Sequence, residues 1–279
     1  MTSLKRLARW MVLPALLAAC DDDDDEVRRF TVTVEAVSAP QTIDSTRAMG
    51  TVPLSAGAFV VFRGDIDPAF RVGTFANTGT ELLAEEGIPS AALAPVDLGI
   101  QTQLEIFEDA QNALAFGPDE PVILEFGEFT ASGGADNGPA IFPALDGFPA
   151  EVSTFMFDAE PGDRLQLQTM FLQSNDWFYA FDDGGLDLFP VDANGISGDV
   201  TDQLVLFDAG TELDTPPGTG PDQKLAQAAG AINVGVAEME LIAFAADRHP
   251  SFVIPPTSAV IRVTISSVPV LGDEGDLDD

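Results

Sequence analysis

The chain has 279 residues, of which 12 are basic and 46 are acidic, so its formal net charge at pH 7 is −34. Nucleic acids and anionic membrane surfaces attract basic proteins, so this charge excludes both as direct partners. Hydrophobic residues make up 46% of the chain, which is enough for the core of one domain of about 250 residues. The excess acid keeps the chain soluble but opposes compaction, and either a salty habitat or an acidic calcium-binding module would explain it.

The N-terminus predicts export. Lys5, Arg6 and Arg9 form a positive region, and the apolar stretch from Trp10 to Ala19 is shorter than the roughly 20 residues of a membrane-spanning helix. We therefore expect a signal peptide at residues 1–19. The sequence Leu17-Ala-Ala-Cys20 resembles a bacterial lipobox, which implies that Cys20 is lipidated and anchors the protein in the cell envelope, facing the periplasm or exterior. The alternative is an ordinary signal peptide followed by an incidental cysteine.

An acidic tether and an acidic tail flank the predicted domain. Residues 20–29 contain six consecutive acids, which repel one another and cannot pack. Residues 269–279 are rich in Gly, Asp and Glu and are expected to be disordered. The domain itself is predicted at 30–268. Because Cys20 is the only cysteine, no intrachain disulfide can form, and the fold depends on its core or on a metal.

Strand patterns dominate the domain. Alternating or continuous apolar runs, separated by Gly, Pro, Asn and Asp, predict strands at 30–37, 58–62, 122–126, 153–157, 163–172, 237–245 and 258–266, and a further apolar run begins at Leu204. One short helix is expected at Thr80–Glu86, with Thr80 as its cap and Gly87 as its end. Residues 131–150 read as a loop. The pattern predicts an all-β antiparallel sandwich with long loops and one or two short helices.

Two segments carry the strongest motifs. They are Met170-Phe-Leu-Gln-Ser-Asn-Asp-Trp177 and Asp208-Ala-Gly-Thr-Glu212, the latter followed by Pro216, Pro217 and Gly220-Pro-Asp-Gln223. Together with Phe59-Val-Val and Asp67-Pro-Ala-Phe70, they resemble the spondin domain over most of the chain, from Phe30 to Ser266. The resemblance implies a C2-like sandwich that binds calcium at one loop end. It also implies Asp176, Asp208 and Glu212 as the ligands.

Three features depart from that family. Glu212 stands where the family usually has an aspartate, and its longer side chain changes the ligand geometry. Phe207 replaces the usual tryptophan. The disulfides of the animal domains cannot form in this chain.

The residues themselves give the metal site independent support. Calcium takes 6–8 oxygen ligands, and a sharp turn at Gly210 lets Asp208 and Glu212 face one point, with Asp176 on a neighbouring loop. Magnesium fits worse because it demands tighter octahedral geometry, and zinc is disfavoured because His249 is the only histidine. The alternative is that three acids among 46 lie close by chance, with Asp176 and Asp208 serving as turn residues.

Trp177 and Tyr179, the only Trp and Tyr after the predicted signal, form either a ligand-binding rim or packing beneath the metal loops. Segments 182–187 and 192–199 suggest EF-hand loops, but glycine is not at the required position. We expect hairpin loops near the site there, with Asp182 or Asp183 available to lend an oxygen.

Catalytic motifs are poor. His249 precedes Pro250, and the sequence has no nucleophile elbow, phosphate-binding loop or zinc-protease helix. We therefore expect a lipid-anchored, calcium-binding spondin-type module for adhesion or for binding an extracellular glycan or protein, and not an enzyme. The alternatives are a carboxylate-based polysaccharide hydrolase and a structural envelope protein whose metal has no ligand role.

Overall fold

The computed structural model describes residues 27–64, 69–89, 122–131, 140–145, 149–182, 184–191, 194–232 and 234–270. The predicted signal peptide, Cys20, the acidic run that follows it and the tail from residue 271 lie outside the described residues, as do Asp67 and Asp183. Within the described part, no helix is long and apolar enough to span a membrane.

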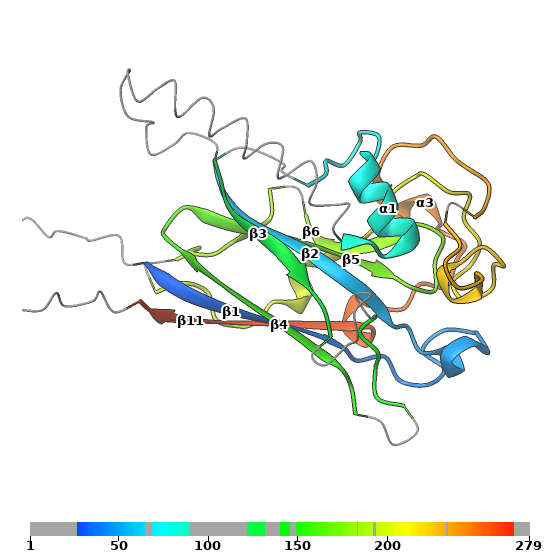
Figure 1. The fold of residues 1–279 in the computed structure, drawn as a ribbon, viewed down its shortest axis with the longest axis horizontal. Coiled ribbons are helices and arrows are strands. Elements are labelled where there is room, and N and C mark those ends of the chain that lie inside the picture. Colours follow the sequence, from blue (N-terminus) through cyan, green and yellow to red (C-terminus); the bar gives the residue numbers. More distant parts are fainter. Residues whose placement is uncertain are drawn as a thin grey trace, which may run out of the picture.

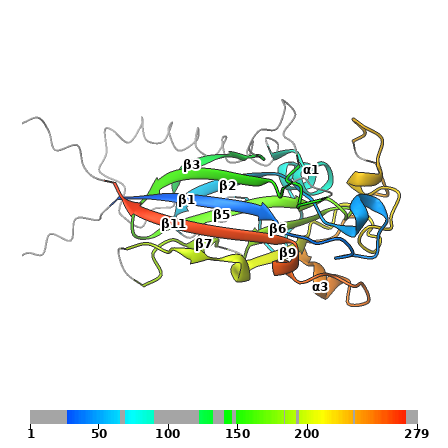
Figure 2. The ribbon, with the colours of Figure 1, turned by 90° about the horizontal axis from the view of Figure 1, so that it is seen from below.

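Two antiparallel sheets face each other (Figures 1 and 2). The first sheet has the order β4-β1-β11-β8, and the second has the order β10-β9-β6-β5-β2-β3, with β7 paired to β5. The described strands are β1 (Arg28–Ala36), β2 (Leu54–Arg63), β3 (Val122–Phe129), β4 (Val152–Ala159), β5 (Asp163–Phe171), β6 (Trp177–Phe181), β7 (Leu186–Asp187), β8 (Gly198–Asp199), β9 (Leu204–Asp208), β10 (Ala243–Phe244) and β11 (Ile261–Pro269).

Alternating side chains build the core between the sheets. In β1, Phe30, Val32 and Val34 are fully buried, while the threonines between them are half-buried, as expected for a strand with one face inward. Phenylalanines from both sheets meet there: the ring of Phe59 stacks on that of Phe155 with centroids 4.2 Å apart. The antiparallel sandwich predicted from the sequence is confirmed.

The second sheet is covered on its outer face as well. Nine of the ten residues of β2 are buried, so this strand cannot have a solvent face. Its Ala58 belongs to a second apolar cluster with Leu83 of helix α1 (Thr78–Glu86), Phe178 and Phe207. Helix α1 packs on β5 and β6 and thereby brings its acidic C-terminal residues close to the loops that follow β9.

Helix α1 starts earlier than predicted. The cap is Asn77, whose side chain accepts a hydrogen bond from the backbone N–H of Thr80, so the assignment of Thr80 as the cap was wrong. Both residues favour N-caps, and the sequence offers no means to choose between them. Gly87 ends the helix with φ of +67°, as predicted.

One predicted strand, 237–245, is largely wrong. Only Ala243–Phe244 forms β10, and α3 (Ala245–Arg248) begins immediately afterwards. Residues 236–242 lie outside the strands apart from an isolated bridge of Ala237 with Glu212. The backbone N–H of Glu240 donates to the carbonyl of Gly210, and that of Ile242 donates to the carbonyl of Thr74. The other predicted strands correspond to β1–β5 and β11, with shifts of a few residues at their ends.

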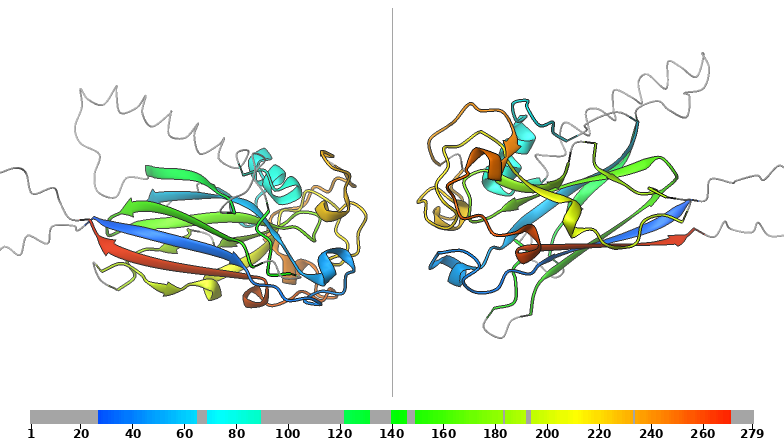
Figure 3. Two further views of the ribbon diagram at one scale, coloured as in Figure 1. Left: turned by 60° about the horizontal axis from the view of Figure 1, so that its bottom comes forward. Right: turned by 180° about the vertical axis from the view of Figure 1, so that it is seen from behind.

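The two ends of the sandwich differ. Val27 and Val270 are joined by a backbone hydrogen bond of 2.9 Å, so both termini of the described domain leave together. Helices α1 and α3 and the loops after β9 gather at the opposite end (Figures 1 and 3). We call this opposite end the loop end, and it holds the candidate site.

Candidate metal centre

Strand pairing brings the two signature segments together. In the pairing of β6 with β9, Trp177 lies opposite Asp208, so the turn before β6 meets the turn after β9. The backbone N–H of Ala209 donates to the carbonyl of Asp176 at 3.1 Å. Gly210 turns the chain with φ of +71°, and a Cβ atom there would lie 2.6 Å from the carbonyl oxygen of Glu240. This position therefore requires glycine, as the sequence predicted.

Asp176 is fully buried and holds the 208–212 turn. Its Oδ2 accepts hydrogen bonds from the backbone N–H groups of Thr211 at 2.7 Å and Glu212 at 3.0 Å, and from the Thr211 hydroxyl at 3.1 Å. Its Oδ1 is buried without a hydrogen-bond partner. Burial, followed by the nearby charge of Asp208, raises the pKa of Asp176 to about 7.

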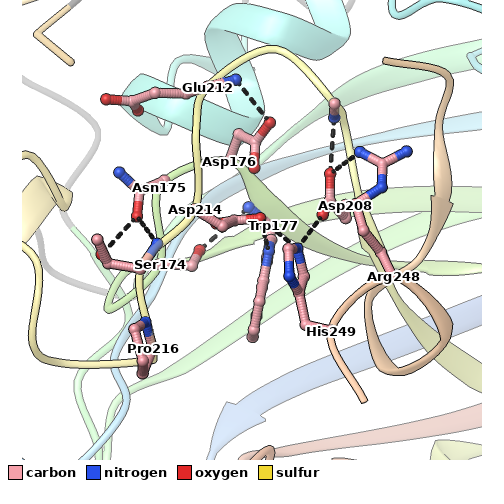
Figure 4. A network of polar contacts seen from close by, with 12 residues as sticks. Ser174, Asn175, Asp176, Trp177, Asp208, Glu212, Asp214, Pro216, Arg248 and His249 are labelled. Atoms are coloured by element: carbon pink, nitrogen blue, oxygen red, sulfur yellow. Dashed lines mark hydrogen bonds and ion pairs between the residues drawn. The ribbon is translucent and has the colours of Figure 1, made fainter. Parts of the chain in front are cut away.

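Asp208 lies between α3 and the turn (Figure 4). Its Oδ1 accepts from the backbone N–H of Gly210 at 2.7 Å and from Nη1 of Arg248 at 2.6 Å. Its Oδ2 lies 2.8 Å from Nε2 of His249. Asp208 is thus the one carboxylate of the site that contacts a permanent cation.

Asp214 faces the same imidazole from the other side. Its Oδ2 is 2.7 Å from Nε2 of His249 and accepts from Nε1 of Trp177 at 2.8 Å, while its Oδ1 is buried without a partner. Burial raises the pKa of Asp214 to about 10, with further contributions from Asp176 and Asp208. One ring nitrogen carries at most one proton, so it cannot donate to both carboxylates at full strength.

Among the described residues, one group has the spacing of a metal site. Ligand atoms of Asp208, Asp214 and His249 all lie within 4.8 Å of one another. The sequence predicted Asp208 but missed the other two. Asp214 lies in the same loop as the predicted Glu212, so its position was an available signal. His249 precedes a proline in a loop, and the sequence carries no sign of its partner. In the structure it directly follows α3, and its Nε2 lies 2.8 Å from Oδ2 of Asp208.

Asp176 and Glu212 lie outside this group of three. The main chain brings Asp176, Asp208 and Glu212 to the same end of the molecule, but their carboxylates do not converge on one point. The Glu212 side chain points to the side of Asp176 away from Asp208 (Figure 4), and its Oε1 is buried without a partner. Burial, then the charge of Glu85, raises the pKa of Glu212 to about 8.

The two aromatic residues do not form a rim. Trp177 and Tyr179 are both fully buried, so neither ring is presented to a ligand in solvent, and the packing alternative describes them. The Trp177 ring stacks on His249 with centroids 5.6 Å apart and donates its N–H to Asp214. Trp177 therefore positions the candidate site from below.

The predicted help from Asp182 is also wrong. Asp182 follows the last residue of β6, whereas the site adjoins the first, Trp177. Five strand residues span roughly 17 Å, which is too far for Asp182 to bind an ion held by Asp208. Asp183 lies outside the described residues.

Charge balance decides what the centre can do. Asp176, Asp208 and Asp214 are almost fully buried, and Arg248 is the permanent cation that contacts one of them. Buried charges must be paired, protonated or bound to metal. At neutral pH the cluster therefore retains protons or takes up a divalent cation, and carboxylate oxygens suit hard cations such as calcium. The partnerless oxygens of Asp176 and Asp214 fit such an ion, while the imidazole of His249 also suits transition metals.

Neither a scan against protein-family models nor a search of the curated proteins finds a match for this chain. The resemblance to the spondin domain therefore rests on the two signature segments and stays a prediction.

Proposed function

We propose that this chain is an exported, lipid-anchored module of the spondin type, with a C2-like sandwich whose loop end binds calcium and, through the ordered loops, an extracellular ligand. The observation that carries the proposal is the buried excess of negative charge in Asp176, Asp208 and Asp214, two of which have an oxygen without a hydrogen-bond partner. A divalent cation would neutralise that excess. Asp208 and Asp214 would hold it, with the free oxygen of Asp176 and the ring of His249 beside it.

Exposed apolar side chains at the loop end support a binding role. Leu213, Val236 and Met239 are 54%, 62% and 84% exposed, and the backbone N–H of Leu213 donates to the carbonyl of Val236. Exposed apolar groups that adjoin one another mark interaction surfaces. These residues lie on the loops around the candidate centre, so an ion that orders the loops would also fix this surface.

Burial favours binding over hydrolysis at this centre. The side chains of Asp208 and Asp214 are 0% and 1% exposed, and His249 is 16% exposed. A polysaccharide cannot reach carboxylates covered in this way, whereas a single ion can. The centre therefore supports the binding module better than the carboxylate-based hydrolase.

The test is thermal unfolding of the protein, first with EDTA and then with increasing calcium chloride. A ligand at 100 times its dissociation constant stabilises the folded state by about 2.7 kcal/mol, which corresponds to roughly 5–10 °C for a domain of this size. We expect such a rise for the wild type and for the control Asp202→Asn, an exposed acid outside the centre. We expect a much smaller rise for Asp214→Asn.

Parallel titrations with manganese and zinc identify the metal. A rise with these ions and none with calcium would overturn the calcium assignment and keep the centre. No rise with any of them, or an equal rise in Asp214→Asn, would refute the proposed centre.

A further inference from the structure

Two segments of the loop end run side by side as a short antiparallel ladder. The backbone N–H of Leu213 donates to the carbonyl of Val236 at 2.8 Å, and that of Glu238 donates to the carbonyl of Thr211 at 2.7 Å. These two bonds flank an isolated antiparallel bridge at Ala237. Because β10 is the last strand of the second sheet, the stretch that precedes it extends the edge of that sheet past β9.

The main chain of Ala237 and Met239 faces away from this ladder. Successive N–H groups of an extended chain alternate between its two edges, and those of Glu238 and Glu240 are bonded to the carbonyls of the 210–211 turn. Within the described residues, the N–H groups of Ala237 and Met239 have no acceptor, and both residues are exposed. An unpaired edge is a template for another extended segment. We call this main chain the open edge.

The chain itself already pairs with the next part of this stretch. The N–H of Ile242 donates to the carbonyl of Thr74 at 2.8 Å, and the carbonyl of Ile242 accepts from the N–H of Gly73 at 2.9 Å. This internal segment covers Ile242 and leaves Ala237 and Met239 exposed. The stretch therefore accepts extended segments by main-chain pairing, and the open edge is the part that is available to a partner.

Apolar side chains adjoin the open edge. Leu213 and Val236 lie opposite each other in the ladder, so their side chains share one face. These two side chains and that of Met239 are each more than half exposed. When a peptide adds to a sheet edge, main-chain bonds give affinity, and contacts to alternate side chains give specificity. A segment that fits this edge therefore has apolar side chains at alternate positions.

The charge around the open edge indicates the other side chains of the partner. Glu238 and Glu240 belong to the stretch itself, and residues 234–242 contain no basic residue. Arg248, whose guanidinium bonds to the stretch, is paired with the buried Asp208. The whole chain has a formal charge of −34, which repels a second copy and attracts a basic partner.

We propose that the open edge binds an extended segment of a partner protein in which apolar and basic residues alternate. The segment adds as a strand beside Ala237 and Met239. Its apolar side chains contact Val236 and Met239, and its basic side chains lie near Glu238 and Glu240. The inference rests on the proposed function in one respect, because this partner is the ligand of the same loop end.

The test measures binding of a fluorescent synthetic peptide of alternating valine and lysine to the full chain, by anisotropy at physiological salt. The control peptide has the same sequence with methylated backbone amides, so it keeps the charge and loses the main-chain donors. We expect the control peptide to bind about tenfold more weakly. Equal binding of the two peptides would mean attraction by charge alone and would refute the proposal.

Surface variants locate the binding. Met239→Ser and Val236→Ser change exposed side chains, so they should weaken peptide binding about fivefold to tenfold without lowering the melting temperature. The control Val191→Ser, 90% exposed and outside the loop end, should bind like the wild type. Unchanged binding by Met239→Ser would overturn the assignment. A wild-type dimer that becomes monomeric in Met239→Ser would also overturn it, in favour of a second copy as the occupant.

Peptide binding and the rise in melting temperature with calcium are separate measurements, so their failures can be told apart. A rise with calcium but no specific peptide binding refutes the open edge and leaves the metal centre. Specific peptide binding without a rise in any of the metal titrations supports the open edge and refutes the metal centre.

Discussion

Replacement of Asp176 by asparagine should stabilise the metal-free protein at high pH. The pKa of Asp176 rises from 3.8 to about 7 through burial and the charge of Asp208. Each pKa unit corresponds to 1.36 kcal/mol, so ionising this group in the folded state costs about 4 kcal/mol. Asparagine removes that cost and keeps a carbonyl oxygen to accept from Thr211 and Glu212. Its NH₂ group occupies the place of the partnerless oxygen, near the Asp208 charge.

The sign of the effect follows from proton binding. An acid with a raised pKa in the folded state gives stability that is complete below its unfolded pKa, near 4, and is lost as pH rises through the folded value. Wild type and Asp176→Asn should therefore melt alike at pH 4. At pH 8, in EDTA, the variant should be more stable by about 2–4 kcal/mol, or roughly 5–15 °C.

Asp176→Ala separates charge from hydrogen bonding. Alanine leaves the buried N–H groups of Thr211 and Glu212 without their acceptor, and each costs about 1–3 kcal/mol. Asp176→Ala should melt below Asp176→Asn at both pH values, as monitored by circular dichroism. If Asp176→Asn melts at or below the wild type at pH 8 in EDTA, Asp176 is not an uncompensated buried charge, and the charge-balance reasoning fails.

Further predictions concern pH and the core. The raised pKa values of Asp176, about 7, and Glu212, about 8, predict that the metal-free protein loses stability in denaturant titrations between pH 4 and 8, and that saturating calcium reduces this loss. Arg63→Met should cost about 3–5 kcal/mol in urea unfolding, because it leaves Asp163, 1% exposed, without its partner at 2.6 Å. Phe155→Ala should cost a similar amount by opening a cavity between the sheets beneath Phe59, whereas an unchanged denaturation midpoint would contradict the packing.

The fold could be predicted because strand patterns are local. The alternation in Phe30–Val37 encodes one buried face, and the run forms a strand of that kind. Asp163–Leu172 also forms a strand, although β5 is buried on both faces. Residues 237–245 are also largely apolar, but only Ala243–Phe244 pairs with a strand, and residues 238–242 bond to loops. Tertiary packing determines which segment pairs with an apolar stretch, and the local sequence pattern does not encode it.

The candidate site was only half predictable for the same reason. Asp176 directly precedes β6 and Asp208 ends its partner β9, so their meeting follows from the motifs. Glu212 and Asp214 are two residues apart in one loop, and the path of that loop decides which carboxylate faces His249.

The candidate centre and the proposed lipid anchor lie at opposite ends of the domain. Strands β1 and β11 each have nine residues and therefore span about 30 Å, with Arg28 and Pro269 at the end where both termini leave. A lipid at Cys20 would hold that end of the domain near the membrane. The carboxylates and the exposed Leu213, Val236 and Met239 would then face away from the bilayer, toward ligands outside. The test is to treat the membrane-anchored protein with a soluble protease. If the membrane protects the loop end from cleavage, this orientation is wrong.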